Sequence, residues 1–182
     1  SIGDTVFQLQ GIQDNSTLNI SNTTFIDCIS LKYSLTISKG TSLLSNCSFI
    51  FSDNRNSCSV LEINSPTSLE IENCEFHRNN NKVFNGGSLF IHNEENKELE
   101  KLSINGILFN NCIGSSFRTL SINHYQMKED LIILNKVVIH NISTGGSIYG
   151  LNIDKDVLFN FLDFQSNQFS NEYGGGYGSY LI

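Results

Sequence analysis

The stretch Leu69-Glu-Ile-Glu-Asn-Cys-Glu-Phe-His-Arg-Asn79 contains the pattern that decides the fold of this chain. Aliphatic residues alternate with polar ones up to Asn73, a Phe follows three residues later, and a second Asn stands three residues after the Phe. Alternation with a period of two residues is typical of a strand with one buried and one polar face. The stretch therefore predicts a half-buried strand followed by a turn.

The same template recurs six times along the chain. Its anchor position is occupied by Phe25, Phe49, Phe76, Phe109, Ile139 and Phe164. These anchors are 24, 27, 33, 30 and 25 residues apart, and a second short apolar strand follows each of them. Short strands at such a period, without helices between them, are typical of solenoids that bury their apolar faces against one another. We expect an all-β fold, a right-handed single-stranded parallel β-helix of about six coils of 24–33 residues. A β-sandwich is the alternative, but it does not explain the recurrence.

Stacked coils explain which residue types recur. Equivalent residues of neighbouring parallel strands lie about 4.8 Å apart. Side chains at one template position should therefore form a ladder inside the solenoid, in which side-chain amides hydrogen-bond to one another and aromatic rings stack. The predicted internal amide ladder consists of Asn22, Asn46 and Asn73, and the predicted aromatic stack consists of Phe25, Phe49, Phe76 and Phe109.

Composition supports the same fold class and excludes several functions. The 182 residues include no Ala and one Pro, but 24 Asn and 24 Ser, which disfavours helices. A net charge of −7 argues against nucleic acid as a partner. No apolar run approaches the about 18 residues of a membrane span, so we expect no direct insertion into a membrane.

Two short motifs alternate along the chain. Phe76-His-Arg-Asn79 and Phe164-Gln-Ser-Asn167 represent the first, and Gly86-Gly-Ser-Leu89 and Gly145-Gly-Ser-Ile148 represent the second. This alternation resembles the repeats of polymorphic outer-membrane proteins, which are surface adhesins of chlamydiae with look-alikes in protists. The wider likeness is to the pectin-lyase-like β-helix superfamily. The resemblance implies a large, extended surface protein, although Ser replaces the Ala of the family's Gly-Gly-Ala motif.

The residues offer little catalytic chemistry. Polysaccharide-cleaving β-helices need convergent carboxylates or acidic Ca²⁺ ligands. The closest acidic pair is Asp154 and Asp156, which we interpret first as solvated turn residues and second as a weak catalytic or metal site. His77 and His140 share a template position but lie two coils apart, about 10 Å, which is too far for one metal ion. We expect no catalytic residue and no cofactor.

Cysteines and glycosylation sequons raise two further questions. Cys47 and Cys74 follow the ladder Asn in consecutive coils, at a separation that permits a disulfide, although stacked thiols are the alternative. Sequons of the form Asn-x-Ser/Thr begin at Asn15, Asn19, Asn22, Asn46 and Asn141. The template places two of these inside the ladder. Glycan is therefore expected only on Asn15, Asn19 and Asn141.

The sequence thus predicts that residues 1–182 form one β-helix segment of a longer solenoid. We expect a non-enzymatic structural or adhesive module of a secreted or cell-surface protein. Its partners would be adjacent coils of the same chain, neighbouring subunits, or glycans. Two alternatives are a β-helix that binds or cleaves carbohydrate, with catalytic residues outside this segment, and a self-assembling filament subunit.

Overall fold

The computed structural model describes residues 5–10, 15–30, 33–54, 59–81, 88–92, 99–114, 120–123, 131–140, 148–152, 156–159 and 162–165. This part of the chain consists of strands and turns and contains no helix. Every pairing between its strands is parallel. The prediction of an all-β fold with parallel strands is confirmed, and parallel pairing separates it from an antiparallel sandwich.

The strands belong to three sheets. Sheet A has the order β1 (Thr5–Gln10), β5 (Tyr33–Ser38), β9 (Ser59–Asn64), β12 (Leu89–His92), β15 (Leu120–Asn123) and β17 (Ile148–Asn152). Sheet C has the order β4 (Ile29–Ser30), β8 (Asp53–Asn54), β11 (Asn80–Asn81) and β14 (Ile113–Gly114). Sheet B contains β2 (Thr17–Ser21), β3 (Thr24–Ile26), β6 (Thr41–Ser45), β7 (Ser48–Ile50), β10 (Ser68–His77), β13 (Lys101–Asn110), β16 (Leu131–His140), β18 (Asp156–Phe159) and β19 (Leu162–Gln165).

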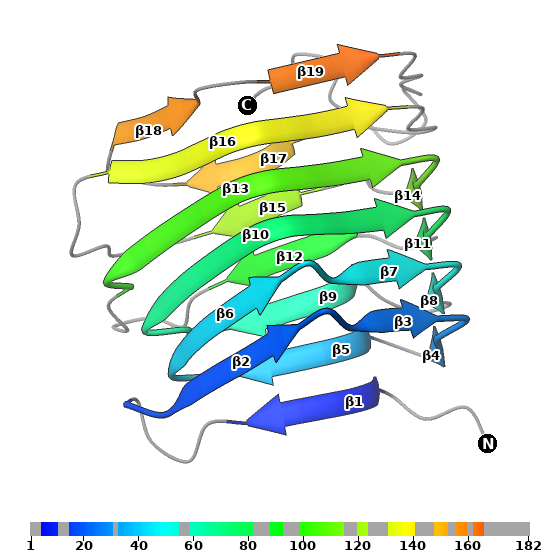
Figure 1. Ribbon diagram of the computed structural model, residues 1–182, viewed down its shortest axis with the longest axis horizontal. Helices are drawn as coiled ribbons and strands as arrows, with labels where there is room; N and C mark the ends of the chain where they lie inside the picture. The colour runs from blue at the N-terminus through cyan, green and yellow to red at the C-terminus, as the bar shows by residue number, and fades with distance from the viewer. Residues whose placement is uncertain are drawn as a thin grey trace.

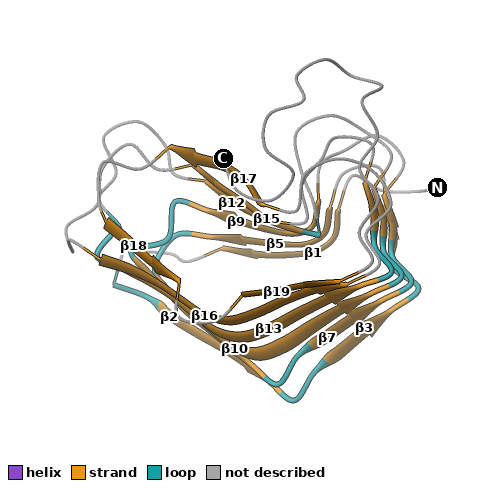
Figure 2. Cartoon of the chain, turned by 90° about the horizontal axis from the view of Figure 1, so that it is seen from above, coloured by secondary structure: helices purple, strands orange, loops and turns teal. Residues whose placement is uncertain are grey.

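The chain visits the sheets in a repeating order, from B to C to A and back to the next position in B (Figure 1). We call each passage a tier: tier 1 comprises β2 to β5, tier 2 β6 to β9, tier 3 β10 to β12, and tier 4 β13 to β15. Sheets B and A lie opposite each other, and sheet C runs along one edge between them (Figure 2). The strand register shifts between Ser121 and Asn123, where β15 pairs with β17.

The interior is built from columns of equivalent residues. Phe25, Phe49, Phe76 and Phe109 stack with ring centroids 4.9, 4.8 and 4.9 Å apart and interplanar angles of 3°, 8° and 18°. The last three rings are 0% exposed. The expected aromatic stack is therefore present. Burial of each such ring contributes about 1.5–3 kcal/mol.

The prediction that Asn22, Asn46 and Asn73 form an internal ladder is wrong, because these residues lie on the outside of the structure. All three side chains are exposed, and the backbone at each is left-handed, with φ of 50°, 52° and 50°. A left-handed residue inserts one extra outward position into the alternation. Glu72 and Asn73 therefore both face out before Cys74 faces in. Asn tolerates this conformation better than most residues, which explains its recurrence.

The same column continues with residues other than Asn. Gly106 and Lys136 also have positive φ, 74° and 53°. A Cβ atom at Gly106 would lie 2.5 Å from the Oδ1 atom of Asn73 in the preceding tier, so glycine provides space as well as backbone freedom there. The members of this column therefore share a backbone bend in sheet B. They do not share hydrogen bonds between side-chain amides.

Candidate functional site

A second left-handed bend follows the Phe anchor, at the corner between sheets B and C. Asp27, Phe51, Arg78 and Asn111 occupy it, with φ of 53°, 58°, 52° and 54°. The residue after the bend is buried in every described tier: Cys28, Ser52, Asn79 and Cys112. These four residues stack in register, as the flanking pairs of sheet C show. We call this set the inner corner column.

Asn79 is the most strongly bonded member of the inner corner column. Its side chain is 0% exposed, its Nδ2 donates to the Phe49 carbonyl at 2.9 Å, and its Oδ1 accepts from the Ser52 N–H at 3.0 Å. Asn79 thereby joins its own tier to the preceding one. This contact explains the spacing of the Phe-x-x-Asn motif, because the anchor fills the core and the Asn holds the following corner.

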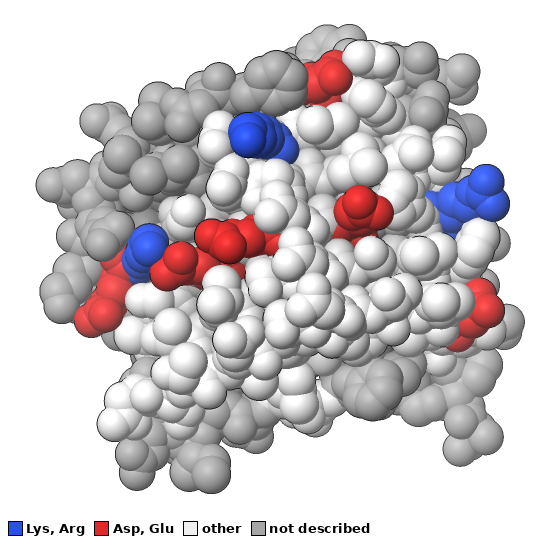
Figure 3. Space-filling view, in the orientation of Figure 1, with Lys and Arg blue, Asp and Glu red and all other residues white. Residues whose placement is uncertain are grey.

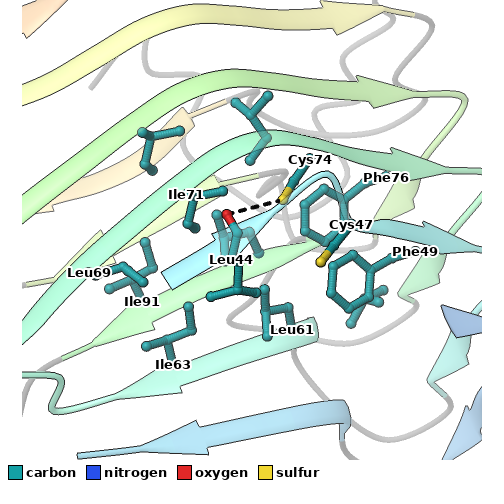
Figure 4. Close-up of a cluster of buried hydrophobic side chains, with 14 of the residues drawn as sticks. Leu44, Cys47, Phe49, Leu61, Ile63, Leu69, Ile71, Cys74, Phe76 and Ile91 are labelled. Carbon is teal, nitrogen blue, oxygen red and sulfur yellow. Dashed lines mark hydrogen bonds between the residues drawn. The ribbon is translucent and has the colours of Figure 1, made fainter. Parts of the chain in front are cut away.

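The four described cysteines are buried free thiols, so the disulfide that the spacing of Cys47 and Cys74 permits is not formed. Cys47 Sγ lies 3.4 Å from the Ile20 carbonyl and 3.4 Å from that of Ser45. Cys74 Sγ lies 3.7 Å from the Leu44 carbonyl (Figure 4) and 3.4 Å from that of Glu72. Each thiol therefore has a carbonyl partner in the preceding tier. Cys47 and Cys74 are stacked thiols, which was the alternative to a disulfide.

Burial makes three of the described thiols, those of Cys28, Cys74 and Cys112, weaker acids. Desolvation raises the pKa of Cys74 from 9.0 to about 12. Burial also raises the pKa of Cys112, and burial together with the charge of Asp27 raises the pKa of Cys28. Because the thiolate is the reactive form, these residues are suited to packing and poorly suited to nucleophilic chemistry.

The outer face of sheet B carries charged residues on β10, β13 and β16, and Figure 3 shows an acidic band on this face. Glu70 accepts a hydrogen bond from Lys101 Nζ at 2.9 Å, and Glu75 Oε2 lies 2.9 Å from His77 Nε2. A partly exposed ion pair such as that between Glu70 and Lys101 contributes about 0–1 kcal/mol. The band is a solvated polar surface.

The histidines and acidic residues considered from the sequence do not converge. His77 and His140 lie on one outer column with Asn110 between them, which matches the expected separation of two tiers. His140 Nε2 lies 3.2 Å from Asp163 Oδ2. Asp156 begins β18 in register with Leu131, whereas Asp154 and Asn141 lie outside the described residues. Among the residues that the structure describes, no group of three or more His, Cys, Asp or Glu side chains could hold a metal ion.

No protein-family model, curated protein or solved structure matches the chain. The likeness to polymorphic outer-membrane proteins therefore rests on the short motifs alone. In the described ranges there is also no helix of the length and apolarity required to cross a membrane.

Sequence reasoning missed the inner corner column and an apolar surface beside it. Ile26, Ile29 and Phe51 are 56%, 47% and 45% exposed. The guanidinium carbon of Arg78 lies 5.3 Å from the centre of the Phe51 ring, a cation–π contact. The signal available in the sequence was the small or polar residue that stands three positions after each Phe anchor: Cys28, Ser52, Asn79 and Cys112.

Proposed function

We propose that this chain is a closed, right-handed, single-stranded parallel β-helix that acts as a rigid structural or adhesive module of a secreted or cell-surface protein. The observation that carries the proposal is the register of the tiers in all three sheets at once. Connections between parallel strands of one sheet are right-handed in about 98% of cases, which supports the handedness. About six tiers at about 4.8 Å each give a rod roughly 29 Å long.

In-register stacking suits a module whose work is mechanical or presentational. Each outer position of sheet B is repeated from tier to tier, as in the series Thr24, Ser48 and Glu75. A partner can therefore contact several equivalent side chains along one line. Loop insertions between tiers leave these lines intact, so such a rod can carry variable loops on a constant frame.

Labelling of intact cells tests the location and the role together. Antibodies against the folded chain should stain unpermeabilised cells of the native source, and external protease should remove the signal. Beads coated with the chain should bind those cells, and soluble chain should compete with them. Staining that requires permeabilisation would refute the surface assignment, and absence of bead binding with surface staining would leave only the structural role.

A filament subunit is the second candidate, and a specific observation favours it. Ile20 and Phe25 of tier 1 are only partly buried, whereas their equivalents Leu44 and Phe49 in tier 2 are 0% exposed. Among the described strands, β2 has a partner in sheet B on one side only. Sedimentation velocity should then show species that lengthen with concentration, and a constant monomer up to millimolar concentration would exclude the filament.

The polysaccharide-cleaving alternative depends on Asp154 and Asp156. Turnover of a broad panel of acidic and neutral polysaccharides, lost in the variant carrying Asp154→Asn and Asp156→Asn, would favour it over the structural module. An inactive wild-type chain across that panel would count against it.

A further inference from the structure

The sequons Asn22-Thr-Thr24 and Asn46-Cys-Ser48 occupy an unusual place in this fold. Both asparagines lie on the outer face of sheet B at a left-handed bend, Asn22 between β2 and β3 and Asn46 between β6 and β7. Burial was the reason to exclude them from glycosylation, and that reason does not hold, because both side chains are exposed. They stand one directly above the other in adjacent tiers, next to the paired residues Ser21 and Ser45.

The hydrogen bonding at these positions leaves the side-chain amides available. The backbone N–H of Asn22 donates to the Ser45 carbonyl at 3.0 Å, and that of Asn46 donates to the Glu72 carbonyl at 2.9 Å. These backbone bonds join the tiers. Neither side-chain amide takes part in a hydrogen bond with the described residues. Conversion of the side-chain nitrogen therefore breaks no hydrogen bond with the described residues, in contrast to Asn79, whose amide makes two buried hydrogen bonds.

The rest of each sequon is presented in a matching way. The middle residue faces inward, with Thr23 half-buried and Cys47 fully buried. The third residue faces outward again, and Thr24 is paired with Ser48 in the ladder between β3 and β7. The acceptor amide and the hydroxyl that defines the sequon thus share one face of the sheet. A sugar chain attached there projects into solvent and enters no part of the core.

We propose that Asn22 and Asn46 are N-glycan acceptors, so that the outer face of tiers 1 and 2 is covered with carbohydrate. The inference rests on the secreted location proposed above. In the reaction, the carboxamide nitrogen attacks the anomeric carbon of a lipid-linked diphosphate oligosaccharide. The new C–N bond forms as the anomeric C–O bond to the diphosphate breaks, the lipid diphosphate leaves with the bonding electrons, and the nitrogen loses one proton.

The position of these sites gives the modification a consequence. Asn22 and Asn46 lie on the same outer face of sheet B as Glu70 and Lys101, which belong to tiers 3 and 4. Glycans on Asn22 and Asn46 would cover the face at tiers 1 and 2 and leave the charged residues of tiers 3 and 4 uncovered.

The test is secretion of the whole chain from a eukaryotic host with a cleavable leader, followed by intact mass and glycopeptide mapping. Asn22 and Asn46 should carry glycan, and Thr24→Ala and Ser48→Ala should each remove one glycan mass while the protein stays folded. A folded, secreted chain in which both asparagines are bare overturns the inference, whether or not Asn15 and Asn19 are modified.

Two designed sequons provide matched controls. Glu75→Thr places a sequon at Asn73, the third exposed member of the same outer column, and should add one glycan to a folded protein. Asn81→Ser places a sequon at buried Asn79, where folded secreted protein should carry no sugar. Sugar at Asn79 in folded protein, or none at Asn73, would contradict the structural basis of the assignment.

Protein from the native source separates the inference from the proposed function. A chain that is glycosylated in the host but bare and intracellular in native cells would refute the surface role and leave the acceptor assignment intact. A chain that is extracellular in native cells but bare at both asparagines would refute the assignment and leave the surface role intact.

Discussion

Asparagine occurs in two columns of this molecule, and its place in each has a different cause. In the outer column, Asn22, Asn46 and Asn73 are exposed and are selected by a left-handed backbone. In the inner corner column, Asn79 is fully buried and is selected by what its amide bonds. Recurrence of one residue type at a fixed interval therefore does not reveal which of its properties is used. The backbone conformation and the burial of each position decide that.

Buried thiols follow both kinds of bend, Cys47 and Cys74 after the outer column and Cys28 and Cys112 at the corner, and they should be unreactive in the native protein. A pKa of about 12 for Cys74, against 9.0 for an ordinary thiol, lowers the thiolate fraction near pH 8 about a thousandfold. Alkylation of Cys74 by iodoacetamide in the native protein should be slower by a similar factor than in urea. The labelling rate is read by peptide mass spectrometry.

The raised pKa of Cys74 also predicts how its labelling rate and its contribution to stability change with pH. Because the folded state raises the pKa of Cys74, the protonated thiol is favoured by folding, and its contribution to stability is complete below about pH 9. That contribution is lost as the pH rises toward 12, so the native labelling rate should climb tenfold per pH unit while unfolded protein levels off. Equal rates in native and urea-unfolded protein at pH 8 would contradict the packing described for this thiol.

Removal of the buried amide should cost the most stability. Asn79→Ala leaves the Ser52 N–H and the Phe49 carbonyl without their partner inside the protein, and we expect a loss of about 2–4 kcal/mol in the free energy of unfolding. Urea denaturation measures the loss. Asn79→Cys should be milder, because Cys28 and Cys112 occupy the same column. A change below 0.5 kcal/mol for Asn79→Ala, a bound set by ordinary surface substitutions, would mean that these bonds do not hold the corner.

The outer column should respond to backbone preference instead. Asn73→Gly should change the free energy of unfolding by a few tenths of a kcal/mol, since Gly adopts positive φ freely, whereas Asn73→Val should cost about 1–2 kcal/mol. The two variants are compared by thermal and urea unfolding. Equal effects of Gly and Val would show that the side chain of Asn73, and not its conformation, stabilises the bend.

The sequence predicted the strands and the Phe stack because both depend on patterns that can be counted along the chain. Alternation marks the inner face of β10, and the recurrence of Phe49, Phe76 and Phe109 marks one column. The outward position of Asn73 could not be predicted by counting residues in the same way. Strict alternation from Ile71 places it inside, and only the sign of φ reveals the extra residue that turns it out. The carbonyl partners of Cys47 likewise depend on the tier below, which spacing alone does not define.

The smallest expected effect concerns a buried polar residue that lacks the partners of Asn79. Ser42 stacks between Leu18 and Leu69 in the core column of sheet B, is 0% exposed, and its Oγ makes no hydrogen bond with the residues that the structure describes. An unpaired buried hydroxyl destabilises a protein, so Ser42→Ala should raise the free energy of unfolding by about 1 kcal/mol. Ser45→Ala, at an outward position of the same strand, is the control and should change little. If Ser42→Ala lowered the free energy of unfolding by a similar amount, the Ser42 hydroxyl would have to be hydrogen-bonded in solution. Burial of Ser42 in this core would then require a partner, as burial of Asn79 does.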